Sequence, residues 1–282
     1  MRTRSFGLGG VQVPVIGQGT WNFPEGGTRR TQAVAALRRG IELGMTHIDT
    51  AEMYGGGRVE EILGDALSSL PREALFVTSK VLPGNASYAG TIAACDATLR
   101  RMRLDYLDCF LLHWPGDHPL EATMRALEDL VERGKARFIG VSNFDLPELR
   151  EARSYLQKIP LSCNEVLYHV RERGIERRLL PYCAAESIAL VGYTPFGRGR
   201  FPRESAAAGA IAAIARARGV TSRQVILGFL TRTAPLFAIP KASSIEHVEE
   251  NAGAGDLVLD AAEIAAIDAA YPIGDDGPLA SL

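Results

Sequence analysis

Short apolar runs alternate with amphipathic segments along almost the whole of the chain. The runs are rich in β-branched and aromatic residues, and most are apolar at nearly every position, as expected for parallel strands that are covered on both faces. The pattern therefore predicts eight buried parallel strands, at residues 15–19, 46–50, 75–81, 106–113, 136–143, 161–168, 189–196 and 236–242.

The segments between these runs have the periodicity of helices. Over residues 59–67 the apolar positions recur at three- and four-residue spacing, so that one face is apolar and the other is acidic. Asp145 and Glu148 have the spacing of a capping box, which predicts that a helix begins just after the fifth strand. After the seventh strand two helical stretches are expected where one would suffice, at residues 205–218 and 222–232.

Strand and helix patterns that alternate eight times without a linker indicate an α/β fold of the (β/α)8 TIM barrel type, with residues 1–282 forming a single domain. Residues 2–13, with a turn at Gly9–Gly10, predict a β-hairpin that caps the N-terminal mouth of the barrel. A doubly wound dinucleotide-binding fold would need the sequence G-x-G-x-x-G. The G-x-G sequences at 7–9, 17–19 and 197–199 all lack the third glycine, which excludes the doubly wound fold.

The composition is that of a soluble globular protein, with 46% hydrophobic residues, 23% charged residues and a formal net charge of −2. Scattered arginines and a small net charge predict binding neither to nucleic acid nor to an anionic membrane. No apolar run approaches the roughly 18–20 residues that span a bilayer, and polar residues interrupt any signal-peptide core near the N-terminus. We expect a cytoplasmic protein that is a monomer or a weak homo-oligomer.

The four cysteines are far apart and lack the spacing of metal ligands, so we expect buried thiols in a reducing compartment. His47 lies two residues before Asp49, which could mimic a metal-binding pair. No second cluster of ligands accompanies it, so a core histidine is expected and no metal site.

Polar residues stand where three of the predicted strands end. Asp49 closes the second strand and Tyr54 follows it in a glycine-rich loop, whereas Lys80 ends the third strand and His113 the fourth. In parallel barrels the catalytic groups lie at the carboxyl ends of the strands, and adjacent strands are only about 4.8 Å apart. A carboxylate, a phenol, an ammonium and an imidazole are therefore expected to share one small volume.

This set of groups suits the protonation of an oxyanion. A free phenol has a pKa of about 10, and a neighbouring ammonium is expected to lower that pKa toward a useful range. Asp49 would keep Lys80 charged and in place, and His113 would orient a carbonyl oxygen toward Tyr54. Because no side-chain nucleophile and no metal set stands out, a hydride carrier is the component that is missing.

Six sequences that occur in order resemble the aldo-keto reductase family: IDTAEMYG, VTSKV, LDYLDCFLLHWPG, IGVSNF, YTPFGRG and IPKASSIEHVEEN. The resemblance covers nearly the whole chain and looks closest to small bacterial members of the methylglyoxal-reductase and diketogluconate-reductase type. It implies an NADPH-dependent reductase that converts small aldehydes, ketones or α-dicarbonyls to alcohols by hydride transfer. Tyr54 would be the general acid, and Lys80, Asp49 and His113 would support it.

The resemblance also implies which residues bind NADPH or NADP⁺. Thr20, Trp21 and Asp49 would lie at the nicotinamide and its ribose, and Ser142 and Asn143 would hold the carboxamide. Tyr193 would stack on the nicotinamide. The loop over the pyrophosphate would contain Thr194, Phe196, Gly197 and Arg198, and the adenosine-phosphate segment would contain Lys241, Ser243, Ser244, His247, Glu250 and Asn251. The N-terminus of the helix after the eighth strand is in any case suited to phosphate.

Two positions depart from the family pattern. Glu165 stands where many members have a glutamine that binds the carboxamide, and His247 stands where many have an arginine that meets the 2′-phosphate. A charged Glu165 near the nicotinamide would favour NADP⁺ over NADPH, whereas a Glu165 that is protonated or paired with a cation would not. A histidine in place of arginine would weaken the preference for NADPH over NADH.

Apolar residues in the loops around these four strand-end residues predict an apolar substrate pocket, with local packing as the alternative. They are Trp21, Phe23, Met53, Leu82 and Trp114.

Two other functions remain open besides the reduction of a small-molecule carbonyl. An inward-pointing lysine at the end of a barrel strand could form a Schiff base, so Lys80 could belong to an aldolase. Some barrels of this family regulate other proteins, so the chain could also be a non-catalytic binding module, although the complete set of four residues argues against it.

Overall fold

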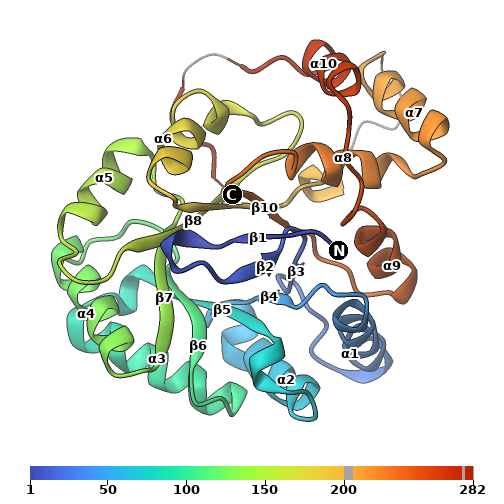
Figure 1. The fold of residues 1–282 in the computed structure, drawn as a ribbon. Helices are drawn as coiled ribbons and strands as arrows, with labels where there is room; N and C mark the ends of the chain where they lie inside the picture. Colours follow the sequence, from blue (N-terminus) through green and yellow to red (C-terminus); the bar gives the residue numbers. More distant parts are fainter. Residues whose placement is uncertain (200–205, 275–276, 282) are drawn as a thin grey trace.

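Eight parallel strands form a barrel that is surrounded by helices (Figure 1). The computed structural model describes residues 1–199, 206–274 and 277–281. Each barrel strand pairs in parallel with the next one along the chain, which confirms the predicted (β/α)8 fold. The strands are β3 (Gln18–Gly19), β4 (His47–Asp49), β5 (Phe76–Val81), β6 (Leu107–Leu112), β7 (Ala136–Ser142), β8 (Leu161–Leu167), β9 (Ala189–Tyr193) and β10 (Leu236–Ile239).

The barrel closes between β10 and the residues that precede β3. Gly17 N donates a hydrogen bond to Ala238 O at 2.8 Å, and Ala238 N donates to Val15 O at 2.9 Å. The predicted first strand, residues 15–19, is therefore in the right place, but only its last two residues are regular strand.

The last two barrel strands end three residues earlier than predicted, β9 at Tyr193 and β10 at Ile239. Thr194 follows β9 with a left-handed φ of 56°, which ends the extended backbone there. Pro240 follows β10 and has no N–H group with which to continue the hydrogen-bond ladder.

Helices cover the outside of the barrel, and the predicted helix over residues 59–67 is confirmed by α2. The capping box is also confirmed, because Asp145 Oδ1 accepts from Glu148 N at 2.9 Å and Glu148 Oε2 accepts from Asp145 N at 2.8 Å. The helices are α1 (Gly27–Glu42), α2 (Arg58–Leu67), α3 (Tyr88–Met102), α4 (Leu120–Glu132), α5 (Leu146–Ser154), α6 (Leu179–Ala185), α7 (Ala206–Arg218), α8 (Ser222–Leu230), α9 (Ile245–Gly253) and α10 (Ala261–Ala270).

Both helical stretches predicted after the seventh strand are present, as α7 and α8. Residue 205, where the first stretch was expected to begin, lies outside the described residues, and α8 ends two residues before the predicted end at 232. Within the part of the chain that the structure describes, no helix has the length and apolar content needed to cross a bilayer.

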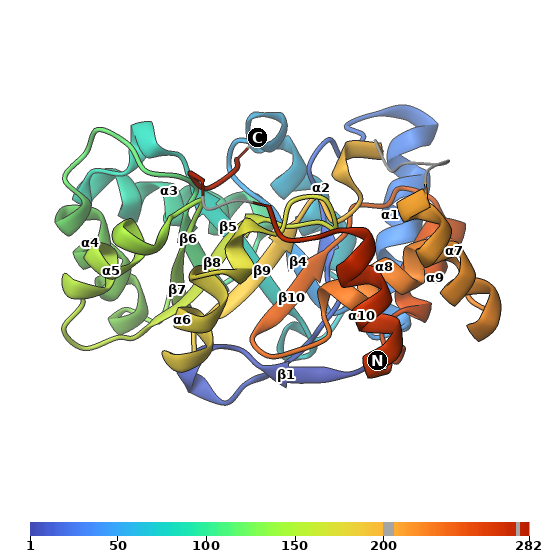
Figure 2. The same cartoon turned by 90° about the horizontal axis from the view of Figure 1, so that it is seen from above.

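A β-hairpin closes one end of the barrel, and the loops that follow the barrel strands lie at the other end (Figure 2). It consists of β1 (Thr3–Ser5) and β2 (Gln12–Pro14), as predicted, but a 3₁₀ turn over Gly7–Gly9 joins them instead of a tight turn at Gly9–Gly10. Phe6, which follows β1, is fully buried against aromatic rings of the barrel interior: Phe76, Phe138 and Phe237.

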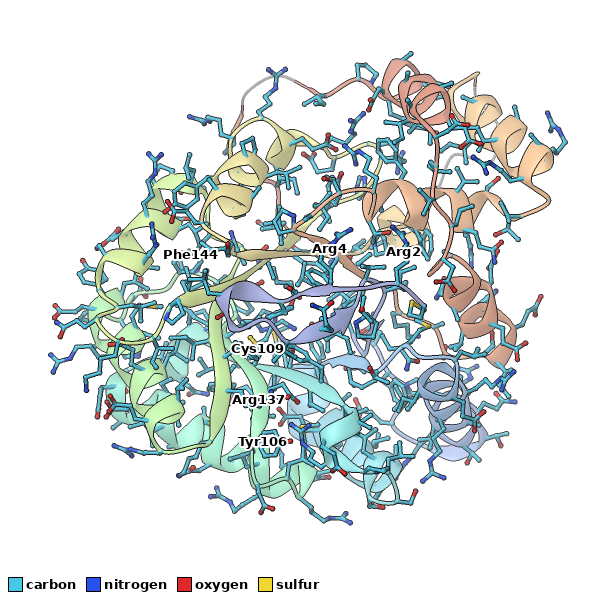
Figure 3. All side chains as sticks on the ribbon, in the orientation of Figure 1. Arg2, Arg4, Tyr106, Cys109, Arg137 and Phe144 are labelled. Atoms are coloured by element: carbon cyan, nitrogen blue, oxygen red, sulfur yellow. The ribbon has the colours of Figure 1, made fainter. Side chains whose placement is uncertain are left out.

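Two arginines, Arg2 just before β1 and Arg4 within it, fasten the hairpin to the C-terminal part of the barrel (Figure 3). Arg4 donates to the backbone carbonyls of Thr231, at 3.1 Å, of Thr233, at 2.7 Å, and of Leu236. Arg2 donates to the carbonyls that follow α9. Burial, with Arg2 nearby, lowers the pKa of Arg4 to about 10, so the guanidinium is still charged at neutral pH.

We expect Arg4→Ala to destabilise the protein without slowing catalysis, because the hairpin lies at the end of the barrel remote from the strand-end loops. Three carbonyls would lose a charged donor, and such hydrogen bonds contribute about 1.5–3 kcal/mol each. Thermal unfolding should shift down by at least about 5 °C. Arg29→Ala, an arginine with an exposed side chain on α1, is the matched control. An equal shift in both variants would contradict this role of Arg4.

Candidate active site

A buried ion pair lies at the carboxyl ends of β4 and β5. The Lys80 ammonium is 2.7 Å from Asp49 Oδ1, and it also donates to the Thr50 backbone carbonyl at 2.9 Å. Asp49 pairs in register with Thr78, two residues before Lys80, so alternation along the strand points both charged side chains into the barrel. Lys80 has no exposed surface, and Asp49 has 2%. The two charges are therefore shielded from water.

Tyr54 reaches this ion pair from the loop after β4. The three glycines that follow it have left-handed φ angles of 59°, 62° and 92°, which glycine adopts readily, and they turn the chain into α2. Lys80 Nζ lies 5.6 Å from the centre of the Tyr54 ring. The rings of Tyr54 and His113 lie 5.9 Å apart, edge to face. The structure thus brings together all four residues predicted at the strand ends.

Burial dominates the acid–base properties of this group. By itself it would lower the pKa of Lys80, but the acidic neighbours, Asp49 foremost, outweigh that effect and keep the ammonium charged. Burial, and to a smaller extent Lys80, lowers the pKa of His113 to about 3, so the imidazole is neutral. Burial also raises the pKa of Tyr54, and the opposing effect of Lys80 does not overcome it. The expectation that Lys80 brings the pKa of this phenol into a useful range is wrong for the protein alone.

Glu165 of β8 joins the same buried group. Its carboxyl Oε1 is 3.3 Å from Lys80 Nζ, and the residue is 3% exposed. Burial, reinforced by the nearby Asp49 carboxylate, raises the pKa of Glu165 well above its ordinary value. This direction and the contact with Lys80 both favour the second of the two alternatives that the sequence left open, in which Glu165 takes up a proton or pairs with a cation.

Polar groups at the end of β7 are held in place by β8 and β9. Ser142 Oγ and Asn143 N both donate to the Glu165 backbone carbonyl, at 3.0 Å and 2.8 Å. Asn143 Oδ1 accepts from the Tyr193 hydroxyl at 2.7 Å, and Asn143 Nδ2 donates to the His113 carbonyl at 3.1 Å. The network fixes an amide side chain next to the neutral imidazole.

One cavity of about 150 Å³ contains most of these groups. Its walls include two residues that the sequence did not indicate, Gly19 and Ile239. A side chain at position 19 would place a Cβ only 2.7 Å from the Ile239 carbonyl, so a glycine is needed for this close approach. The lining residues are Gly19, Thr20, Trp21, Asp49, Met53, Tyr54, His113, Trp114, Ser142, Asn143, Glu165, Tyr193, Thr194, Arg198, Ile239 and Lys241.

The predicted apolar substrate pocket is only partly present. Trp21, Met53 and Trp114 line the cavity and are partly exposed, between 36% and 40%. Phe23 does not line it, because the turn in which Phe23 N donates to Thr20 O directs this residue into the hydrophobic core. Leu82 is also outside the lining, and its backbone N–H donates to a carboxylate of the loop after β4.

The loops around the cavity contain strained backbone. Asn143, Thr194 and Arg198 all have left-handed φ angles, between 55° and 61°. Such conformations cost about 1–3 kcal/mol each for residues other than glycine, and they concentrate at functional sites. The Arg198 guanidinium lies 4.7 Å above the centre of the Trp21 ring, so the loop after β9 reaches across to the loop after β3.

The N-terminus of α9 forms a polar surface beyond the cavity. Ser244 caps the helix by accepting from His247 N at 3.4 Å, and Lys241 Nζ donates to Ser243 Oγ at 3.1 Å. Burial lowers the pKa of Lys241. Further along the helix, Asn251 is 1% exposed and its Oδ1 has no hydrogen-bond donor. A charged amine and two hydroxyls at the N-terminus of α9, with an unsatisfied acceptor in the last turn of the same helix, fit the adenosine-phosphate end of NADP.

The remaining predicted residues lie beside this surface, together with one that sequence reasoning missed. Glu250 forms an ion pair with Arg223 of α8 at 3.4 Å, and the Arg223 guanidinium lies 5.3 Å from the centre of the Phe196 ring. Gly197 has a left-handed φ of 59° in the same loop as Phe196. No sequence signal distinguishes Arg223 from the many surface arginines, because only the fold brings α8 to this place.

His47 is buried in the core as expected. Its ring packs edge to face on Phe76, and Nε2 is 3.3 Å from Thr78 Oγ1. Burial lowers the pKa of His47 to about 3. Among the described residues no group of histidine, cysteine, aspartate or glutamate side chains is arranged to hold a metal ion.

Comparison with known proteins agrees with this geometry. The model of the Aldo/keto reductase family matches residues 15–272. Methylglyoxal reductase YeaE of Escherichia coli is 43% identical over 265 residues, which cover 94% of this chain and 93% of that protein. Glyoxal reductase of Bacillus subtilis is 35% identical over 262 residues, which cover 92% and 90%. An aldo-keto reductase of Klebsiella pneumoniae, solved in complex with NADPH, has a TM-score of 0.92 and 43% identity, covering 100% of this chain and 99% of that one.

We expect Lys80→Met to lose activity and stability together, because Asp49 would be left without a counter-charge. Removal of one partner of a buried ion pair costs about 3–5 kcal/mol. In the double variant Lys80→Met/Asp49→Asn the unpaired charge is gone, so the melting temperature should recover while turnover does not. A double variant no more stable than Lys80→Met would show that the ion pair does not account for the loss.

Proposed function

The chain belongs to the aldo/keto reductase family and is an NADP-dependent oxidoreductase, and on this premise we propose that it reduces small α-dicarbonyls and simple aldehydes to alcohols with Tyr54 as the general acid. The observation that supports the proposal is the shared cavity of Tyr54, Lys80, Asp49 and His113, with the polar end of β7 at its edge.

The cavity and the α9 surface provide groups for both ends of NADPH. Ser142 and Asn143 would hold the carboxamide, Tyr193 would stack on the nicotinamide, and Lys241 with the hydroxyls at the start of α9 would bind the 2′-phosphate. When bound, NADPH supplies the hydride. The remaining cofactor positions keep the roles that the family resemblance gave them.

In this reaction the side chains of the cavity would stabilise and then protonate one negatively charged oxygen. Hydride addition to a carbonyl carbon leaves that charge on the carbonyl oxygen, where Tyr54 would deliver its proton. A neutral imidazole can donate a hydrogen bond, so His113 would hold the oxygen beside the phenol. Lys80 would then stabilise the phenolate, because it stays charged in this buried position.

The size of the cavity supports a small substrate. Its volume of about 150 Å³ must take the nicotinamide as well as the substrate, because Ser142, Asn143 and Tyr193 line the same cavity, so little of it is left for the substrate. Two tryptophans and a methionine at its mouth would exclude water from a compact carbonyl compound. The relatives named as methylglyoxal reductase and glyoxal reductase act on compounds of this kind.

A Schiff-base aldolase is disfavoured by the state of Lys80. An amine must be unprotonated to attack a carbonyl, but the Lys80 ammonium is held by Asp49, by the Thr50 carbonyl and by Glu165. Treatment with borohydride in the presence of a carbonyl substrate should therefore leave no adduct on the protein.

Tyr54→Phe tests the proposed general acid. Loss of a positioned proton donor typically costs 10²–10⁴-fold, so kcat with NADPH and methylglyoxal should fall by at least about 10² while the Kd for NADPH barely changes. Glyoxal and a bulky aromatic aldehyde should be assayed with the wild-type protein, where the small dicarbonyls should have the higher kcat/KM. Retention of more than a tenth of the activity by the variant would rule out Tyr54 as the acid.

His247→Arg tests the proposed phosphate site. Arginine offers a permanent charge and a two-pronged donor, and hydrogen bonds of this kind contribute about 1.5–3 kcal/mol. The Kd for NADPH should fall by about tenfold or more. The Kd for NADH, which lacks the 2′-phosphate, serves as the internal control and should stay the same. A parallel change in both constants would place His247 away from the phosphate.

A further inference from the structure

The buried group around Lys80 has an uneven count of charges. Asp49, Lys80 and Glu165 are all at most 3% exposed, and the two carboxyl groups both contact the single ammonium, at 2.7 Å and 3.3 Å. With both carboxyls ionised the three side chains would carry a net negative charge in a place with little water. Like charges that share one site are avoided when one of the two groups keeps a proton.

The hydrogen bonds of the group are also one donor short. Lys80 has three N–H donors: it donates to Asp49 Oδ1 and to the Thr50 carbonyl, which leaves one N–H for Glu165 Oε1 at 3.3 Å. Asp49 Oδ2 is buried and has no hydrogen-bond donor when Glu165 is ionised. Both carboxyl groups contact the one Lys80 ammonium and each affects the pKa of the other, so they are close neighbours, and a proton on Glu165 would supply the missing donor.

No other cation contacts the carboxyl of Glu165 among the described residues. The neighbouring strands and loops direct titratable groups toward this part of the barrel, but only Lys80 is a close positive charge. The groups in question are Asp49 from β4, Tyr54 from the loop after it, Lys80 from β5, Cys109 from β6, His113 after β6, Cys163 on β8 itself and Tyr193 from β9, with Arg198 and Lys241 elsewhere on the cavity wall.

We propose that Glu165 is a proton store, which is protonated in the free protein and in the NADPH complex and gives up its proton when the positively charged nicotinamide ring of NADP⁺ shares the cavity. Glu165 lines the same wall as Tyr54 and Asn143, so this charge would arise beside its carboxyl group. The positive ring would replace the proton as the partner of the carboxylate, whereas the neutral ring of NADPH would not.

The stored proton would also restore the general acid after each turnover. Lys80 Nζ lies 5.6 Å from the centre of the Tyr54 ring and 3.3 Å from Glu165 Oε1, so it is the neighbour that the two groups share. As Tyr54 Oη becomes a phenolate, one N–H bond of Lys80 breaks and an O–H bond forms on Tyr54. The O–H bond of Glu165 then breaks and the N–H bond of Lys80 forms again. The step ends with a neutral phenol, a charged lysine and a carboxylate, and the carboxylate regains its proton from solvent when NADP⁺ leaves.

Calorimetry can detect this proton without any turnover. Each cofactor is titrated into the wild-type protein at neutral pH in two buffers with different ionisation enthalpies, and the difference gives the protons exchanged. The release should be larger for NADP⁺ than for NADPH by up to about one proton per site. In Glu165→Gln, which keeps the shape but cannot ionise, the two cofactors should release the same amount. Equal release in the wild type, or an undiminished difference in the variant, would overturn the proposal.

Affinity and infrared spectra give two further readouts. In the wild type the ratio Kd(NADP⁺)/Kd(NADPH) should fall as pH rises, by up to about tenfold per pH unit, and in Glu165→Gln it should be flat. Both cofactors carry the same 2′-phosphate, so its titration cancels in the ratio. If the variant does not fold, the wild-type infrared difference between the two complexes should still show loss of a protonated carboxyl band with NADP⁺. An unchanged band or a flat wild-type ratio would contradict the proposal.

The inference rests on the proposed function only in placing the nicotinamide beside Tyr54. Failure of the inference can be distinguished from failure of the proposed function, because proton release is measured when the cofactor binds and the activity of Tyr54→Phe is measured at turnover. If Tyr54→Phe is inactive while both cofactors release protons equally, the reductase mechanism stands and the proton store falls. If proton release depends on Glu165 while Tyr54→Phe stays active, the assignment of the general acid falls instead.

Discussion

The ammonium of Lys80 is the charge on which the arrangement of the cavity depends. A lysine without exposed surface is stable only if nearby oxygens compensate for the water that it lost, and here Asp49, the Thr50 carbonyl and Glu165 do so. The same ammonium lies next to the phenol of Tyr54, and it adds to the effect of burial, which lowers the pKa of His113 and keeps the imidazole neutral. Burial has the largest effect on the pKa of each titratable group around it, and this one buried cation is the charge to which all of them respond.

The fold and the central residues could be predicted because both follow from local rules. Parallel strands buried on two faces are apolar throughout, and all of them present their carboxyl ends to the same side. Polar residues that interrupt such a pattern at strand ends, such as Asp49 and His113, must then meet. The turn after Tyr54 could also be predicted, because its three consecutive glycines can adopt left-handed conformations without steric cost.

The other features of the site depend on distances between residues, which a sequence does not contain. The direction of Phe23 follows from one backbone hydrogen bond in a loop, and the ion pair of Arg223 follows from where α8 packs. The pKa of Tyr54 is a balance between burial and a single cation, and its sign could not be inferred from the presence of Lys80 alone. The early end of β10 could have been found, since Pro240 is visible in the sequence.

Thr194 lines the cavity and has a strained backbone conformation. It is β-branched and yet has a φ of 56°, a conformation that such side chains rarely adopt. Replacement by glycine would relieve that strain in the folded state, but it would also give the loop after β9 more freedom in the unfolded chain. Both effects act on the free energy of unfolding and oppose each other, so the loop after β9 would gain less stability than the relief of strain alone suggests.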